Sequence, residues 1–141
     1  MSVNLIISLA LGLQAAAAPT FAPAPAPADV AVLTGATEAR DCGGLLQTPA
    51  YCVGSTLAAV GAIAEAYVTD LQGKGWISAG GGANRVIFVK RHEGGGCDGL
   101  QMQAFYDVNR PAAPEAPAYL AFAVIPRDIC VAETPATPSP Q

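Results

Sequence analysis

The side chains that could perform chemistry gather in one glycine-rich segment, KRHEGGGCDG, which contains the only histidine of the chain. Cys97, His92 and Asp98 could act as nucleophile, base and orienting acid of a covalent hydrolase. However, a histidine in a charged loop is usually solvated, and a cysteine of an exported protein is usually oxidised. We therefore expect a non-enzymatic protein. A small secreted hydrolase that uses His92 with a nearby carboxylate is the alternative hypothesis.

The composition excludes several classes of protein. The chain has 141 residues, with 7 Lys and Arg against 11 Asp and Glu, and a formal net charge of −4. This balance argues against nucleic-acid binding, which needs a basic face for phosphate contacts, and it favours a neutral or basic partner. With 52% hydrophobic and 13% charged residues, the chain is too apolar for wholesale disorder. The glycine-rich stretches lack the GK[S/T] ending of a phosphate loop, so we expect no cofactor.

The chain has four cysteines, Cys42, Cys52, Cys97 and Cys130. An even number in an exported chain indicates two disulfides. The spacing lacks the short ligand pairs of a zinc site, so we expect no metal. If the strands expected near residues 100–108 and 119–127 pair so that Val108 faces Tyr119, the same register places Cys97 opposite Cys130. This register predicts the disulfides Cys97–Cys130 and Cys42–Cys52.

Both ends of the chain have the composition of segments outside a folded domain. An uncharged apolar run followed by small residues is typical of a signal peptide over residues 1–18, although no Lys or Arg precedes the run. Residues 19–29 are a Pro/Ala-rich linker, and residues 133–141 are a Pro-rich tail that we expect to be disordered. The folded domain then covers residues 30–132, in the periplasm or outside the cell. We expect a membrane contact only if the N-terminal segment stays uncleaved, because its apolar run is shorter than the ~20 residues of a span.

The hydrophobic pattern predicts one helix followed by strands. From Thr56 to Gln72 the apolar residues form a helical stripe, with Ser55 or Thr56 as the N-cap. The stripe consists of Leu57, Val60, Ala64, Tyr67, Val68 and Leu71. Strand signals follow at Trp76–Ser78, Arg85–Arg91, Leu100–Val108 and Tyr119–Ile125. We therefore expect an α+β fold, with one amphipathic helix packed on a three- to four-stranded antiparallel meander and two disulfides.

The expected hairpin register also predicts a candidate binding patch. One face of the hairpin combines glutamines with large apolar side chains: Gln101, Gln103, Phe105, Leu120, Phe122 and Val124. Apolar anchors within a polar rim are typical of binding surfaces. If residues 30–50 cover this face, it is core instead. If they do not, the protein is an exported, inhibitor-like binding or accessory domain of the cell envelope or secreted fraction. It would then bind a protein partner or a second copy of itself through this face.

Overall fold

The computed structural model describes residues 22–130. The predicted signal peptide over residues 1–18 and the predicted tail over residues 133–141 lie outside this range. So does the beginning of the predicted linker. Within the described range, no helix has the length and apolar character needed to cross a membrane.

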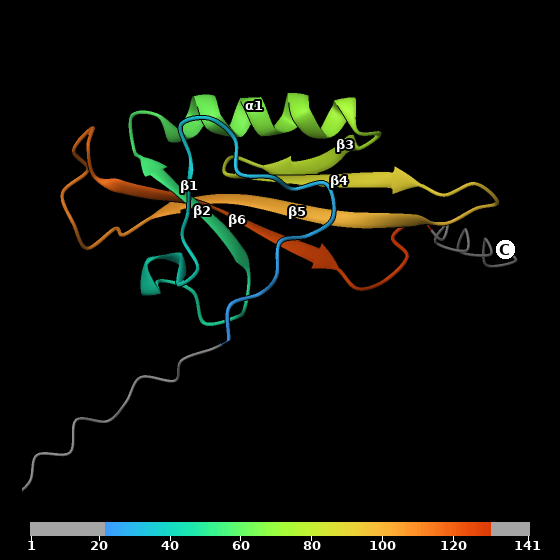
Figure 1. The fold of residues 1–141 in the computed structure, drawn as a ribbon, viewed down its shortest axis with the longest axis horizontal. Coiled ribbons are helices and arrows are strands. Elements are labelled where there is room, and N and C mark those ends of the chain that lie inside the picture. The colour runs from blue at the N-terminus through green and yellow to red at the C-terminus, as the bar shows by residue number, and fades with distance from the viewer. Residues whose placement is uncertain (1–21, 131–141) are drawn as a thin grey trace, which may run out of the picture.

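Six strands form a single antiparallel sheet with the spatial order β1-β2-β6-β5-β4-β3 (Figure 1). The elements in chain order are β1 (Thr37–Glu38), the 3₁₀ turn η1 (Cys42–Gly44), β2 (Tyr51–Thr56), α1 (Val60–Gly73), β3 (Ile77–Gly82), β4 (Arg85–Arg91), β5 (Cys97–Tyr106) and β6 (Pro117–Ile125). Strands β3 to β6 are a meander, and β2 pairs with β6 on its other side. Because β2 and β3 lie at opposite sides of the meander, α1 crosses the sheet to connect them.

The predicted fold class is wrong in the number of strands and in the helix. Strands β1 and β2 were not predicted, because the segment before the helix contains glycine and polar residues and gives no clear strand signal. Ser55 and Thr56 end β2 instead of capping the helix, and α1 begins only at Val60. The helix is short and buries Ile63, Tyr67 and Leu71 rather than the whole predicted stripe. The protein is thus mostly a six-stranded antiparallel sheet with one short helix.

The register of the β5–β6 hairpin also differs from the expectation. Pairing Val108 with Tyr119 would place Leu100 opposite Arg127, whereas Leu100 lies opposite Val124, a shift of three residues. Successive side chains of a strand point to opposite faces, so an odd shift exchanges the partners across the hairpin. Met102 now faces Phe122. Leu100 and Met102 of β5 thereby share one face with Leu120 and Phe122 of β6.

The main core lies between that face and α1. Its buried residues include Phe88, Leu100, Met102, Leu120 and Phe122 from the strands and Ile63, Tyr67 and Leu71 from the helix. The rings of Tyr67 and Phe122 are 4.8 Å apart between centroids. This contact joins the helix to β6 in the middle of the sheet. We call this side of the sheet the helix face.

The N-terminal segment covers the rest of the helix face. In Figure 1 its blue trace crosses in front of the strands beside α1. The Tyr67 hydroxyl donates a hydrogen bond to the carbonyl of Ala31, and the Leu33 amide donates to the Tyr67 oxygen. Asp29 fixes the start of this segment: its Oδ2 accepts from Lys90 Nζ at 2.9 Å and from Trp76 Nε1 at 3.1 Å. Tyr67 and Asp29 thus hold the segment against the core.

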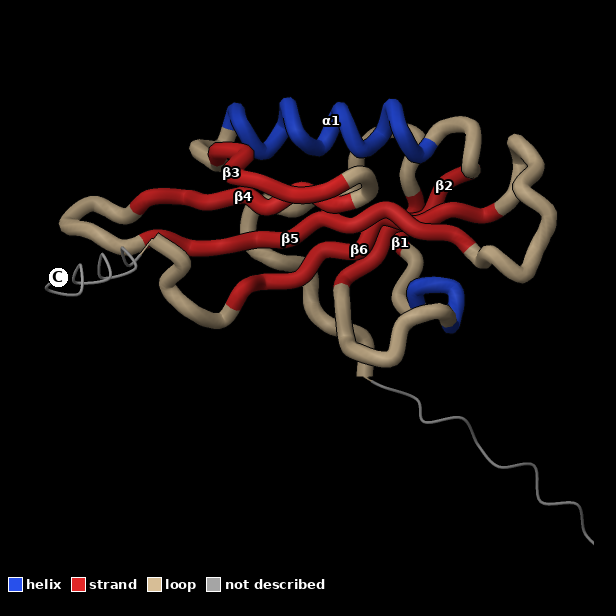
Figure 2. The backbone as a smooth tube through the Cα atoms, turned by 180° about the vertical axis from the view of Figure 1, so that it is seen from behind, coloured by secondary structure: helices blue, strands red, loops and turns tan. Residues whose placement is uncertain are grey.

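The opposite side of the sheet, which we call the open face, is built from the alternate residues of each strand. Its cross-strand rows are Arg85–Gln103–Ala121–Cys52, Ile87–Gln101–Ala123 and Val89–Gly99–Ile125. Figure 2 looks onto this face, and no described segment crosses in front of the middle of β4, β5 and β6. The two faces of the sheet are therefore covered very differently.

Candidate functional site

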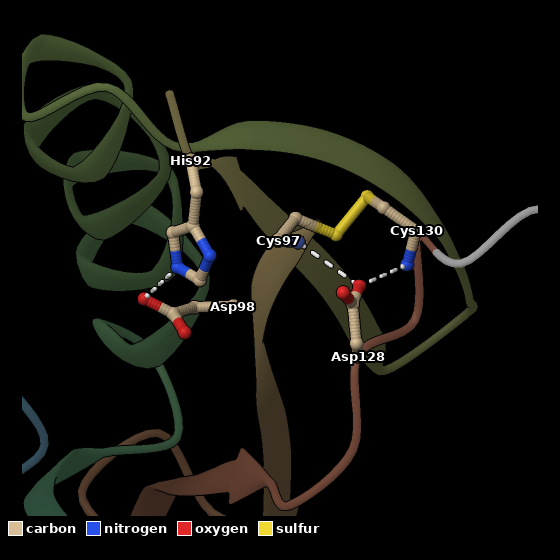
Figure 3. The surroundings of a disulfide bond; sticks show 5 residues. All are labelled: His92, Cys97, Asp98, Asp128 and Cys130. Carbon is tan, nitrogen blue, oxygen red and sulfur yellow. Dashed lines mark hydrogen bonds and ion pairs between the residues drawn. A yellow bond between two sulfur atoms is a disulfide. The ribbon is translucent and has the colours of Figure 1, made fainter. Parts of the chain in front are cut away.

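The predicted catalytic residues meet at the end of the sheet where β4 passes into β5 (Figure 3). His92 Nε2 lies 3.0 Å from Asp98 Oδ2, and the two side chains remain 49% and 59% exposed. The sulfur of Cys97 is bonded to that of Cys130. The suggested nucleophile is therefore blocked, and the pair that remains is a solvated contact at a strand end.

The Cys97–Cys130 disulfide, predicted from the sequence, fastens a loop over one end of the open face. After β6 the chain turns back, and the Asp128 carboxylate accepts hydrogen bonds from the amides of Cys97, at 2.9 Å, and Cys130, at 3.0 Å (Figure 3). Ile129 then lies directly over Gly99, where an added Cβ would be only 2.8 Å from its Cδ1. The pairing is as predicted, but it results from this folded-back loop and not from the expected hairpin register.

The same three residues could suggest a metal site. One ligand atom each from Cys97, Asp128 and Cys130 lies within 4.8 Å of the others. The thiolate is the form of cysteine that binds metals, and both of these sulfurs are joined in the disulfide. The chemistry of this donor set therefore does not fit a metal ion.

The Cys42–Cys52 disulfide covers the other end of the open face. Cys52 lies opposite Ala121 on β6, and with Cys42 they form a small buried cluster. Turn η1 packs closely on this end, because a Cβ at Gly43 would come within 2.6 Å of the Tyr119 ring. Gly43 also has φ 67°, a conformation that glycine adopts without cost. This pairing, too, is the predicted one.

The predicted binding patch is not a single surface. Leu120 and Phe122 are 1% exposed and belong to the core on the helix face. Val124 shares their side of the sheet, although it is exposed. Only Gln101, Gln103 and Phe105 lie on the open face. The expectation that Leu120 and Phe122 anchor a partner is therefore corrected: they anchor α1 and the N-terminal segment.

A different exposed surface takes its place, between the two disulfides. We call it the central platform and define it by Arg85, Ile87, Gln101, Gln103 and Ala123. Each of these side chains is at least partly exposed. The Gln101 amide donates a weak hydrogen bond, at 3.4 Å, to Gln103 Oε1. The loops that the disulfides fasten cover both ends of the open face and leave this middle free.

Sequence reasoning missed Arg85, Ile87 and Ala123 as neighbours of the glutamines. A signal for Ala123 was present: of the two hairpin alignments, only the observed one places Leu100 and Met102 on the same face as Leu120 and Phe122. Choosing the register by that separation would have placed Gln101 opposite Ala123 and Gln103 opposite Ala121. The positions of Arg85 and Ile87 depend on the separate register of β4 with β5.

Two surface hollows occur elsewhere on the described residues, and His92 lines neither. The first, of about 80 Å³, lies between η1 and the β5–β6 loop and is lined in part by Tyr106, Arg110 and Tyr119. It is smaller than the roughly 300 Å³ of ordinary ligand pockets. The second, of about 300 Å³, lies between residues 23–26 and the ion pair of Glu38 with Arg40. Neither hollow brings together groups for catalysis.

The comparisons with known proteins give no family for this chain. No family model, no curated protein and no solved structure matches it. The two disulfides are consistent with an oxidising, exported environment.

Proposed function

We propose that this protein is an exported, non-enzymatic binding module that holds a protein partner on the central platform. The observation that carries the proposal is the unequal covering of the sheet. The helix face is closed by α1 and residues 29–36, whereas the middle of the open face has no described segment over it (Figure 2). A partly apolar surface with polar neighbours suits a protein interface.

The disulfides support the same proposal in two ways. They fasten loops at both ends of the open face, so the platform lies within a rigid frame and a partner would order little of it on binding. They also fit a protein that works in the cell envelope or the secreted fraction. Export by the predicted signal peptide can be tested by sequencing the N-terminus of the protein recovered from its source, which should begin near residue 19.

The alternative, a secreted hydrolase, has less support. A general base must lie within reach of a bound substrate, with a second group to stabilise the developing charge. The contact of His92 with Asp98 is compatible with a base, but both side chains are about half exposed. Among the described residues, the sulfurs near this pair, those of Cys97 and Cys130, are joined in a disulfide.

Site-specific photo-crosslinking tests the platform directly. A photoreactive phenylalanine analogue replaces Ile87 on the platform in one variant and the exposed Ala66 of α1 in a matched control. Both full-length proteins are oxidised, checked for an unchanged melting temperature and mixed with the envelope fraction of the source. We expect discrete crosslinked products from position 87 and not from position 66. Equal products from both positions, or products only from position 66, would refute a binding role for the platform.

A further inference from the structure

We propose that the partner on the central platform is an acidic protein segment whose carboxylates pair with Arg85 and Arg91. The inference rests on the proposed function, and it concerns the chemistry of the partner. It reverses the simplest interpretation of the net charge, which favours a neutral or basic partner.

The cationic side chains fall into two groups: those that form an ion pair and those that do not. Of the seven Lys and Arg residues, four form ion pairs: Arg40 with Glu38, Lys74 with Asp70, Lys90 with Asp29, and Arg110 with Asp107. The other three, Arg85, Arg91 and Arg127, have no ion pair among residues 22–130. Arg85 and Arg91 occupy open-face positions at the two ends of β4, opposite Gln103 and Cys97. Arg127 lies in the loop that folds back over the same face.

The acidic residues show the complementary distribution. Among the paired strands β3 to β6 the only carboxylate is that of Asp98, which lies opposite Lys90 on the helix face. No aspartate or glutamate occupies an open-face position on these four strands. The loop that folds back over their end carries Asp128 beside Arg127, and the Asp128 carboxylate accepts hydrogen bonds from the amides of Cys97 and Cys130. A chain with a net charge of −4 therefore presents a locally positive surface here. Such a surface attracts anionic groups and speeds their encounter.

The spacing and the lining favour a protein segment over other anions. Arg85 and Arg91 are six residues apart on one strand, about 20 Å at the usual rise of ~3.3 Å per residue. Between them lie Ile87 and Gln101, which offer aliphatic contact and amide hydrogen bonds, and Val89, which is buried. None of these side chains adds a positive charge. A protein segment with apolar or amide groups between separated carboxylates matches this order. Arginine is also suited to carboxylates, because its planar fork can bind both oxygens.

A second copy of this chain fits the platform poorly. Two open faces packed against each other would bring unpaired arginines together, with no open-face carboxylate on the strands to neutralise them. Like charges across an interface are unfavourable. A sulfated polysaccharide or a lipid headgroup surface offers the middle of the platform no peptide amides or apolar side chains to contact Gln101 and Ile87.

The test measures the affinity of the oxidised, full-length protein for poly-L-glutamate. The test variant is the double substitution Arg85→Gln/Arg91→Gln. The control is Arg40→Gln/Arg110→Gln, which removes the same charge from highly exposed side chains elsewhere. Heparin and phosphatidylglycerol vesicles serve as anionic probes of the other classes. We expect the test variant to bind poly-L-glutamate about tenfold more weakly, and the control to stay within about twofold of the unsubstituted protein.

Three results would overturn the inference: no binding of poly-L-glutamate, equal losses in the two double variants, or tighter binding of heparin or vesicles than of poly-L-glutamate. These failures are distinct from failure of the proposed function. If position 87 crosslinks a partner while any of the three occurs, only the acidic nature of the partner is refuted. If positions 66 and 87 crosslink alike, the platform itself is refuted.

Discussion

The two faces of one sheet are completed in different ways. On the helix face, large apolar side chains are buried beneath α1 and the N-terminal segment, and Lys74 and Lys90 each have a carboxylate partner. On the open face, disulfides fasten loops at the two ends, and Ile87, Gln101, Gln103 and Ala123 occupy the middle. Arg85 and Arg91, which have no ion pair among residues 22–130, lie at the two ends of β4. The comparison teaches that noncovalent packing closes one side of the sheet, whereas disulfide-fastened loops cover only the ends of the other side; recognition on that side is our proposal.

The most damaging change should be one in the core of the helix face. Phe122 is 1% exposed and packs on Tyr67, so Phe122→Ala should lower the free energy of unfolding by about 3–5 kcal/mol. The matched change on the open face, Ile87→Ala, removes a partly exposed side chain and should cost under about 1 kcal/mol. Urea unfolding followed by circular dichroism measures both. Similar losses for the two variants would break the distinction between the faces.

Removing the disulfides should have the next largest effect. In the chain-entropy model the Cys97–Cys130 bond, with a sequence separation of 33, contributes about 4 kcal/mol, and the Cys42–Cys52 bond, with a separation of 10, about 3 kcal/mol. Each pair is replaced by serines, and both variants are unfolded in urea. A dye that binds exposed apolar surface would distinguish the two variants further. Loss of Cys97–Cys130 should free Ile129 from Gly99, so that variant should bind more dye than the variant without Cys42–Cys52. Unchanged stability in both variants would mean that the loops are held without their disulfides.

Removing the charge of Asp29, which holds the N-terminal segment on the helix face, should lower the free energy of unfolding by a smaller amount that depends on pH. The hydrogen bonds from Lys90 and Trp76 lower the pKa of the Asp29 carboxyl below its ordinary value of 3.8. Such a carboxyl stabilises the fold above its ordinary pKa, and the contribution is lost as the pH falls through the folded-state value. Asp29→Asn should therefore cost about 1 kcal/mol at neutral pH, and the difference from the unsubstituted protein should shrink below pH 3.8. A difference that stays constant down to pH 2 would show that the charge of Asp29 is not what matters.

The smallest effect is expected for the arginines of the open face. Arg85 has no ion pair among the described residues, so Arg85→Gln should change the unfolding free energy by less than about 0.5 kcal/mol. Lys90→Gln, on the opposite face of the same strand, removes the 2.9 Å contact with Asp29 and should cost more. Thermal melts of the two variants make the comparison. A larger loss for Arg85→Gln would reveal a structural role and weaken its assignment to binding.

Part of this architecture could be predicted from the sequence. Strand β4 coincides with the predicted Arg85–Arg91, because a run of β-branched and aromatic residues has few alternatives. The helix was located, but its start was not, because Ser55 and Thr56 are equally suited to the end of a strand. Strand β2, with the sequence YCVGST, carries a weak strand signal. Pairing with β6 and β1 and the burial of Tyr51 and Val53 stabilise it.

The candidate site was less predictable, because it depends on long-range pairing. Alternation of apolar and polar residues alone permits more than one alignment of the β5–β6 hairpin. The three-residue error moved Leu120 and Phe122 from the core to the surface and separated Gln101 from its true neighbours. That Arg85 and Arg91 form no ion pair within residues 22–130 cannot be seen in a sequence, because it depends on where the carboxylates lie in the fold.

The most direct test of the central claim is an NMR titration of the isotopically labelled, oxidised full-length protein with poly-L-glutamate. If the open face is the recognition surface, amide shifts should concentrate in β4 and in Leu100–Gln103 of β5, while the amides of α1 and of residues 29–36 stay in place. Shifts centred on α1, or on His92 and the β4–β5 loop alone, would contradict the account.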